Sequence, residues 1–256
     1  MKSFSGLFKK DLLISRFWSV TWMFCMLLAI FASFAFAHYT GEPMALFGAF
    51  VTILLFHSLF CPLMIISQLR LEGKTQLWLY NPNKGAVLLL SKLAAAAVYQ
   101  LASQVILFMF GLIVRGFLRP VADSMFSVSD LFLVNIAAFL ESVFFAIWVM
   151  FLWTIYEALR KYPAIKKIRW LIPLFIYNAY GLLEGLFIKS GLFESAQKFW
   201  SLSLKMNFKF HYYQDSGWTV SFSKIDLPGV LLLYYAVLGV CLFYFSGKIL
   251  DRRVEV

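Results

Sequence analysis

Six long apolar runs constrain this sequence more than any other feature, because each is long enough to cross a lipid bilayer as a helix. The runs are about 19 to 26 residues long, and a helix needs about 20 residues to span the hydrocarbon core. The sequence therefore predicts an all-α membrane protein with one embedded domain. Its six transmembrane helices are expected at residues 18–37, 44–67, 93–114, 131–156, 170–188 and 227–245.

The basic residues between these runs predict the orientation of the chain. The sequence has 23 Lys and Arg residues and a formal net charge of +10. If the N-terminus is cytoplasmic, the segments on that side carry 16 of these residues and the opposite side carries 7. Basic loops tend to stay on the cytoplasmic side during insertion. We therefore expect both termini inside. Because orientation explains the positive charge, we expect no binding of nucleic acid.

The N-terminal residues 1–16 have a pattern of their own. Phe4, Leu7, Phe8 and Leu12 recur at helical spacing and share one face. An amphipathic helix with lysines on its other face is typical of a segment that lies in the membrane interface. We expect such an interfacial helix ahead of the first span. The alternative is an ordinary charged flank without fixed structure.

The outer loop 190–226, between the fifth and sixth spans, alternates apolar and polar residues. The alternation starts at Leu202 and continues to Tyr212; after the turn residues at 214–217 it resumes at Trp218. A period of two is typical of a β-strand with one buried face. We expect an extracytoplasmic β-hairpin over residues 201–225. What its apolar face contacts stays open.

No motif in the chain supports catalysis. Gly73-Lys74-Thr75 resembles the end of a nucleotide-binding P-loop, but the earlier glycine of that loop is replaced by Gln68. The chain has no metal-ligand spacing of Cys and His and no hydrolase motif. We therefore expect no enzyme activity, no metal and no cofactor within this chain.

Three ionisable residues fall within the predicted spans: His57, Glu141 and Glu184. A charge there is costly, so such a side chain is expected to face the interior of the helix bundle, a partner or a watery path. Each of the three either strengthens helix packing through a hydrogen bond or contacts a substrate or proton. The sequence leaves both roles open.

The connection 68–92 is more ordered than a simple linker. Glu72 closes a charged patch, an apolar stretch follows, and a leucine run ends at Lys92. This loop resembles the signature loop of type-2 ABC exporter permeases, in which an acidic residue, a leucine-rich stretch and a proline precede a lysine that opens the third span. Lys10-Asp11 in the N-terminal stretch is similar to part of the connecting helix of that family, and the layout matches over nearly the whole chain.

The resemblance implies a half-transporter in the bacterial plasma membrane. Two such chains, identical or paralogous, would form the path between them, driven by separate cytoplasmic ATPase subunits. The matching loop would transmit the ATP-driven closure through Glu72, Leu77, Trp78, Leu79 and Pro82. From their polarity inside the spans, four residues are expected to line the path: Gln100, Gln104, Glu141 and Asn178.

Two other functions remain open from the sequence. One is a secondary carrier driven by protons through His57, Glu141 and Glu184. The other is a membrane assembly or sensory protein whose outer hairpin binds a partner without transport. The transported substrate, the direction of transport and the pairing of chains are not encoded in any motif.

Overall fold

The computed structural model of the chain describes residues 2–75, 83–118, 127–190, 201–213 and 217–254. Six helical segments within these residues are long and apolar enough to cross a membrane, which confirms the six predicted spans. The chain is a multi-pass membrane protein. The segments are α1 (Lys2–Thr40), α2 (Met44–His57) followed by α3 (Phe60–Thr75), α4 (Gly85–Phe117), α6 (Val128–Ala158), α7 (Leu171–Ile188) and α9 (Gly229–Ile249).

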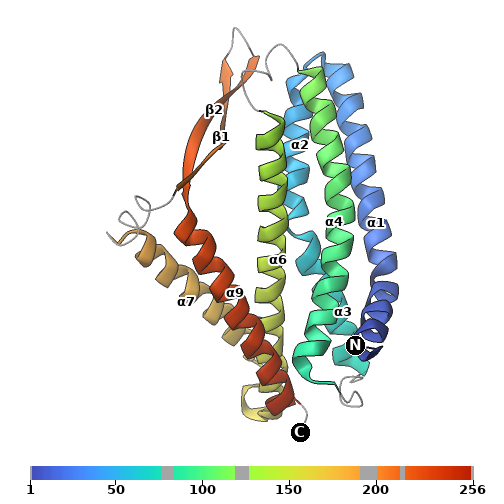
Figure 1. Cartoon of the computed structure of the whole chain (residues 1–256), viewed down its shortest axis with the longest axis vertical. Coiled ribbons are helices and arrows are strands. Elements are labelled where there is room, and N and C mark those ends of the chain that lie inside the picture. Colours follow the sequence, from blue (N-terminus) through green and yellow to red (C-terminus); the bar gives the residue numbers. More distant parts are fainter. Residues whose placement is uncertain (1, 76–82, 119–126, 191–200, 214–216, 255–256) are drawn as a thin grey trace.

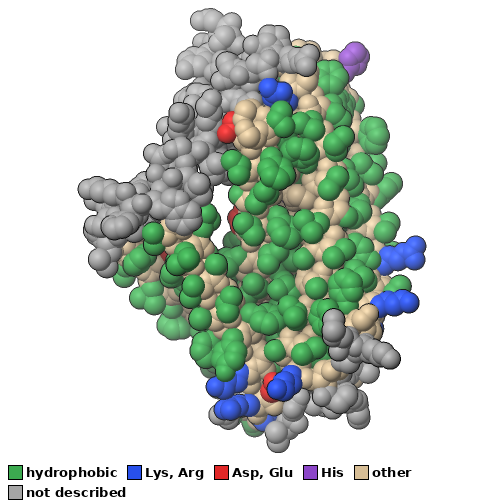
Figure 2. Space-filling view, viewed as in Figure 1, with side chains coloured by type: hydrophobic (Ala, Val, Ile, Leu, Met, Phe, Trp, Pro, Cys, Tyr) green, Lys and Arg blue, Asp and Glu red, His purple; other side chains and the backbone are tan. Residues whose placement is uncertain are grey.

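The helices α1, α2, α3, α4 and α6 stand side by side, whereas α7 and α9 lean away from them (Figure 1). Both chain termini lie at one end of the bundle, which we call the basal end; the opposite end is the distal end. Helix α4 contacts α1, α3, α6 and α9 and is the centre of the bundle. No residue of α7 is buried. On the face drawn in Figure 2, hydrophobic side chains cover the bundle along its length, and Lys and Arg lie mostly in its basal half.

The second span is broken into two helices. We expected one run over 44–67, but α2 ends at His57 and α3 begins at Phe60. The break lies just before Pro62, whose nitrogen carries no hydrogen and whose ring clashes with the carbonyl four residues earlier, at Ser58. The backbone instead makes a tight turn, in which the Leu59 amide donates to the Phe56 carbonyl at 3.1 Å.

The expected interfacial helix is not a separate element. Helix α1 runs without interruption from Lys2 to Thr40 and includes the first predicted span. Its buried residues in the N-terminal half are Leu7, Asp11, Ser15 and Ser19, so the face that packs against the bundle is mostly polar and includes only Leu7 of the expected apolar face. The physical reason is a set of polar contacts from Asp11 to α4, described below, which hold this half of α1 against the bundle.

The connection between the second and third spans is shorter than expected. Helix α3 continues to Thr75 and α4 begins at Gly85, so much of the expected loop 68–92 is helical. Polar residues extend both helices beyond the apolar runs, because a helix satisfies its backbone in water as well as in lipid. Residues 76–82 lie outside the described part of the chain.

Two strands follow α7, namely β1 (Ser201–Tyr213) and β2 (Gly217–Pro228). They pair antiparallel in a register that runs from Ser201 opposite Pro228 to Tyr213 opposite Gly217, with a shift between Leu204 and Asn207. The second strand ends three residues beyond the expected hairpin, and α9 begins directly after it. The pair extends toward the distal end (Figure 1). Its place outside the membrane stays a prediction.

Three short helical turns complete the basal end. The turns η2 (Leu159–Lys161) and η3 (Pro163–Ile165) connect α6 to α7. The wider turn η4 (Leu250–Val254) follows α9. The last turns of α9 pack against the start of α4 with little space to spare: a Cβ atom on Gly247 would lie 2.9 Å from the Ala86 Cβ atom. The end of α9 is therefore fixed closely against α4.

Candidate functional site

A buried network of four charged side chains joins α1, α3 and α4 near the basal end. The Lys92 ammonium at the start of α4 lies 2.8 Å from a Glu72 carboxylate oxygen and 3.1 Å from an Asp11 carboxylate oxygen. The Lys10 ammonium lies 2.9 Å from the same Glu72 oxygen. We call Lys10, Asp11, Glu72 and Lys92 the ion network. Two positive and two negative charges balance, which an enclosed group of charges requires.

The centre of the ion network is shielded from solvent. The side chains of Lys92, Asp11 and Glu72 are 2%, 1% and 7% exposed, whereas Lys10 is 38% exposed and closes the network toward the outside. The Ser91 hydroxyl donates to the second Asp11 carboxylate oxygen. Charges removed from water are stable only where they are paired and hydrogen-bonded. The ion network therefore fixes the relative positions of three helices.

Further polar contacts continue this junction along and beside α1. The Tyr99 hydroxyl of α4 donates to the Leu12 carbonyl at 2.9 Å. The Gln68 amide of α3 donates to the Ser15 hydroxyl at 2.5 Å. At the first residue of α4, the Gly85 amide donates to the Asp251 carboxylate at 2.5 Å, and a carboxylate there is favoured by the helix dipole. These contacts join α1, α3 and η4 to one another or to the basal half of α4.

A second polar group lies deeper in the bundle, beside the break between α2 and α3. Its members come from α2, α4 and α6, and all are at most 7% exposed. We call it the polar cluster: His57, Gln100, Ser103, Gln104, Asn135 and Ser142. Its tightest contact across helices is the Gln104 amide, which donates to the Asn135 side-chain oxygen at 2.8 Å and to the Asn135 backbone carbonyl at 3.1 Å.

The polar cluster satisfies backbone groups that the break leaves free. The Gln100 amide donates to the His57 carbonyl at 3.3 Å, and the Cys61 backbone amide donates to the Ser142 hydroxyl at 3.3 Å. The His57 ring stacks on Phe60, with centroids 5.9 Å apart and planes at 3°. In lipid, such groups must find partners within the protein. The cluster thus stabilises an interrupted span in the middle of an apolar bundle.

The four residues expected to line a path are divided by the structure. Gln100 and Gln104 are buried in the polar cluster, as their spacing on one helix face suggested. Glu141 and Asn178 are exposed on the outer surfaces of α6 and α7. The Asn178 amide donates to the Leu174 carbonyl of its own helix at 2.8 Å. Within this chain the four side chains do not line one route.

The residues expected to couple the chain to an ATPase are also divided. Leu77, Trp78, Leu79 and Pro82 lie outside the described residues. Glu72 is described, but its carboxylate is enclosed in the ion network instead of facing outward. In this chain the Glu72 carboxylate is therefore not accessible for the direct contact with a partner that the resemblance implies. Asp11 and Lys92 are parts of the family resemblance, but no pattern in the sequence indicates that Lys92 contacts both Asp11 and Glu72.

Replacing Asn135 with leucine is expected to destabilise the protein by about 1–2 kcal/mol, because the buried Gln104 amide then loses its side-chain acceptor and keeps only the backbone carbonyl of residue 135. Asn178→Leu is the matched control. Each asparagine amide donates to the carbonyl four residues earlier at 2.8 Å, but only Asn135 is buried and bonded across helices. Unfolding in mixed detergent micelles measures both variants. Equal losses of stability would contradict a cross-helix role for Asn135.

One curated relative covers the full length of the chain. This relative is the "Uncharacterized protein YhcE" of Bacillus subtilis (strain 168), and it is 33% identical over 262 residues, with all of both chains aligned. No protein-family profile matches the chain. No solved structure matches it either.

Proposed function

The chain belongs to the family of the Bacillus subtilis protein YhcE. From the resemblance of its N-terminal stretch and its loop 68–92 to exporter permeases, we propose that it is the permease subunit of an ATP-binding-cassette exporter. The subunit lies in the bacterial plasma membrane with its basal end toward the cytoplasm. Two such chains form the translocation path, and separate cytoplasmic ATPase subunits drive it. The six spans and the excess of basic residues on the proposed cytoplasmic side support this arrangement.

The ion network supports this function most directly. The resemblance to exporter permeases is carried by two segments: the N-terminal stretch with Lys10-Asp11, and the loop 68–92, which contains the acidic Glu72 and ends at Lys92. In the fold, Lys92 contacts both Asp11 and Glu72. A chance likeness of sequence would not require its three polar positions to meet in space.

The ion network also suggests how a force on the connecting loop would reach the membrane. Glu72 lies just before residues 76–82, and Lys92 lies after them, so the loop is anchored at both ends by one ion pair. Asp11 joins α1 to the same pair. An ATPase that moves the loop would move the basal parts of α1, α3 and α4 together. The break at Ser58–Leu59 separates α3 from α2 and is a suitable joint for that motion.

Two exposed polar residues support a path between two chains. Glu141 and Asn178 lie in membrane-spanning helices, yet both face outward from this chain. A carboxylate or an amide exposed to lipid is unfavourable. A second chain or a water-filled path beside α6 and α7 would remove that cost. In this proposal the outward residues, rather than Gln100 and Gln104, contact the transported molecule.

The proposed function predicts a soluble ATPase that co-purifies with the chain from its native cells in mild detergent. The double variant Leu77→Ala/Trp78→Ala is expected to lose at least about nine-tenths of that ATPase, since apolar side chains in the centre of an interface dominate its affinity. Quantitative mass spectrometry of the purified complexes measures the ratio of ATPase to permease.

The control Leu13→Ala/Trp18→Ala removes the same two residue types from α1, where Leu13 and Trp18 are 62% and 56% exposed on the surface of this chain. This variant should retain the ATPase. A chain that purifies without any ATPase, after cross-linking as well, would contradict the proposal.

Such an outcome would favour the functions that need no ATPase. A proton-driven carrier would use His57, Glu141 and Glu184, but the structure places these residues apart. His57 is in the polar cluster, Glu141 is exposed on α6, and Glu184 accepts a 2.6 Å hydrogen bond from the Tyr235 hydroxyl. Transport that persists without ATP and stops without a proton gradient would identify a carrier. A defect caused by deletion of the hairpin, without a transport defect, would identify an assembly or sensory protein.

A further inference from the structure

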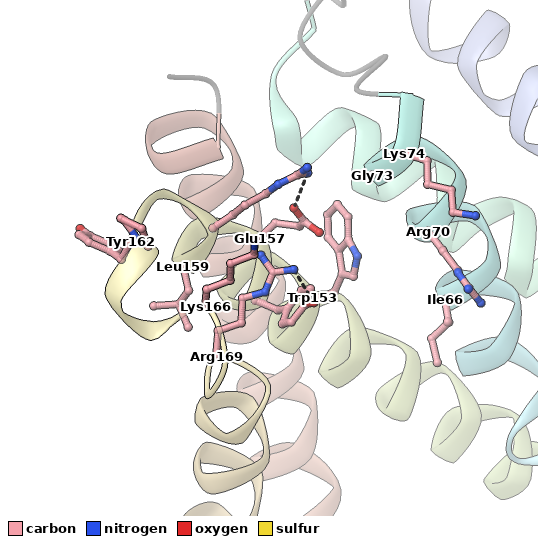
Figure 3. A pocket seen from close by; sticks show the side chains of 13 residues that line it. Ile66, Arg70, Gly73, Lys74, Trp153, Glu157, Leu159, Tyr162, Lys166 and Arg169 are labelled. Carbon is pink, nitrogen blue, oxygen red and sulfur yellow. Dashed lines mark hydrogen bonds and ion pairs between the residues drawn. The ribbon is translucent and has the colours of Figure 1, made fainter.

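A groove with a volume of 1020 Å³ opens at the basal end, between α3 and the connection from α6 to α7. Its lining residues are shown in Figure 3. Ile66, Arg70 and Lys74 lie along α3 on one side, Trp153 is in the middle, and the η2–η3 turns form the other side. The groove is separate from the ion network and from the polar cluster, because none of its lining residues belongs to either.

The charge of the groove is strongly positive. Glu157 is the one acidic residue among those that line it, and its carboxylate lies 3.7 Å from the Arg160 guanidinium. The Arg169 guanidinium lies over the Tyr156 ring at 4.0 Å and donates to the Tyr156 hydroxyl at 2.5 Å. Five basic side chains line the groove: Arg70, Lys74, Arg160, Lys166 and Arg169.

The rest of the lining is apolar or aromatic. Ile66 and Leu159 supply aliphatic surface, and Trp153 and Tyr162 supply rings. Tryptophan and tyrosine are enriched where a membrane protein crosses from hydrocarbon to headgroups. The groove is also at the basal limit of two spans, since it is formed by the ends of α3 and α6. It therefore combines positive charge with apolar surface at the depth where lipid headgroups lie.

We infer that this groove binds the phosphate-bearing headgroup of an anionic phospholipid from the surrounding membrane. Basic pockets between helices on the cytoplasmic side are suited to such headgroups, because the phosphate meets the ammonium and guanidinium groups. The start of the acyl chains would lie along Ile66 and Trp153. A free phosphate ion would leave most of the 1020 Å³ unfilled and would gain nothing from the apolar wall.

The apolar wall and the position beside the spans also favour a lipid over an acidic protein surface. The inference does not depend on the transport function proposed above, but it rests on the proposed cytoplasmic position of the basal end. It explains the many basic residues of the η2–η3 connection by a contact with lipid as well as by the orientation of the chain in the membrane.

Native mass spectrometry of the purified full-length chain tests the inference. Phosphatidylglycerol, phosphatidylcholine and inorganic phosphate are added separately at equal concentrations. We expect phosphatidylglycerol to bind most tightly. The double variant Arg70→Gln/Lys166→Gln should lower that affinity about 25-fold, since each basic residue near an anionic headgroup contributes about fivefold.

The matched control is Lys9→Gln/Arg252→Gln. It removes the same two residue types and the same charge from exposed basal positions outside the groove. This variant should change the affinity less than about twofold, because distant exposed charges are screened. Size-exclusion chromatography of each variant verifies that it is folded.

Three results would overturn the inference. Equal losses in the two variants would mean that total charge, and not the groove, holds the lipid. Displacement of phosphatidylglycerol by an equal concentration of inorganic phosphate would identify a site for free anions. Unchanged lipid binding in Arg70→Gln/Lys166→Gln, together with loss of a co-purifying protein, would identify the groove as a protein contact.

Discussion

Lys92→Met is expected to destabilise the protein by about 3–5 kcal/mol, the largest effect of any single substitution considered, because it leaves the buried Asp11 carboxylate without its closest charged partner and Glu72 with Lys10 alone. Lys92 contacts both Asp11 and Glu72 and is 2% exposed. Lys10 remains, but it is partly exposed and lies 3.8 Å from Asp11. Unfolding in mixed detergent micelles, followed by intrinsic fluorescence, measures the change in free energy.

Two control variants distinguish the effect of leaving a buried carboxylate unpaired from the effect of removing one positive charge. Lys9→Met removes an exposed lysine from the same end of the protein and should change stability by less than about 0.5 kcal/mol. The double variant Lys92→Met/Asp11→Asn removes one charge of each sign and leaves Lys10 with Glu72. It should lose less stability than Lys92→Met alone, since its remaining charges balance. If Lys92→Met were as stable as Lys9→Met, the ion network would not hold the helices together.

Gly247→Ala is expected to destabilise the protein by about 1–3 kcal/mol, because the added methyl group overpacks the contact between α9 and α4. The new Cβ atom would lie 2.9 Å from the Ala86 Cβ atom and 3.1 Å from the Ala86 Cα atom. Backbone atoms of a helix cannot rotate aside as a side chain does. The displacement of α9 would also pull Asp251 away from the Gly85 amide. Thermal unfolding detected by size-exclusion chromatography measures the loss.

Gly239→Ala provides the comparison within the same helix. A Cβ atom there would lie 3.7 Å from side-chain atoms of Phe144 and Ile147, an ordinary contact. Alanine also forms helices better than glycine by up to about 1 kcal/mol, so Gly239→Ala should be neutral or stabilising. A Gly247→Ala variant as stable as Gly239→Ala would show that the basal contact tolerates a wider separation of α9 and α4.

The number of spans could be predicted from the sequence because it depends only on the length of apolar runs. The ends of the helices could not, since α1, α3 and α4 all continue into polar residues at the basal end. The interruption at Ser58 was also missed. Pro62 was visible in the sequence, but a proline predicts a break only when the resulting free backbone groups have partners, and these come from α4 and α6.

The residues that form the candidate sites could likewise be predicted only where one helix face brings them together. Asp11 and Lys92 are separated by 81 positions along the chain, so no local pattern indicates that they form a pair. Gln100 and Gln104 were found because their spacing places them on one helix face. Polarity alone did not reveal that Ser142 faces inward while its neighbour Glu141 faces outward. That distinction depends on which side of α6 packs against the bundle.

The ion network also has a consequence for how the chain is made. Lys10, Asp11 and Glu72 precede Lys92 in the chain, so before the third span is made the two carboxylates have only one of the two ammonium groups of the ion network. A nascent chain that stops before α4 therefore has one more negative than positive charge at these positions. Synthesis of the third span supplies Lys92 and completes the junction.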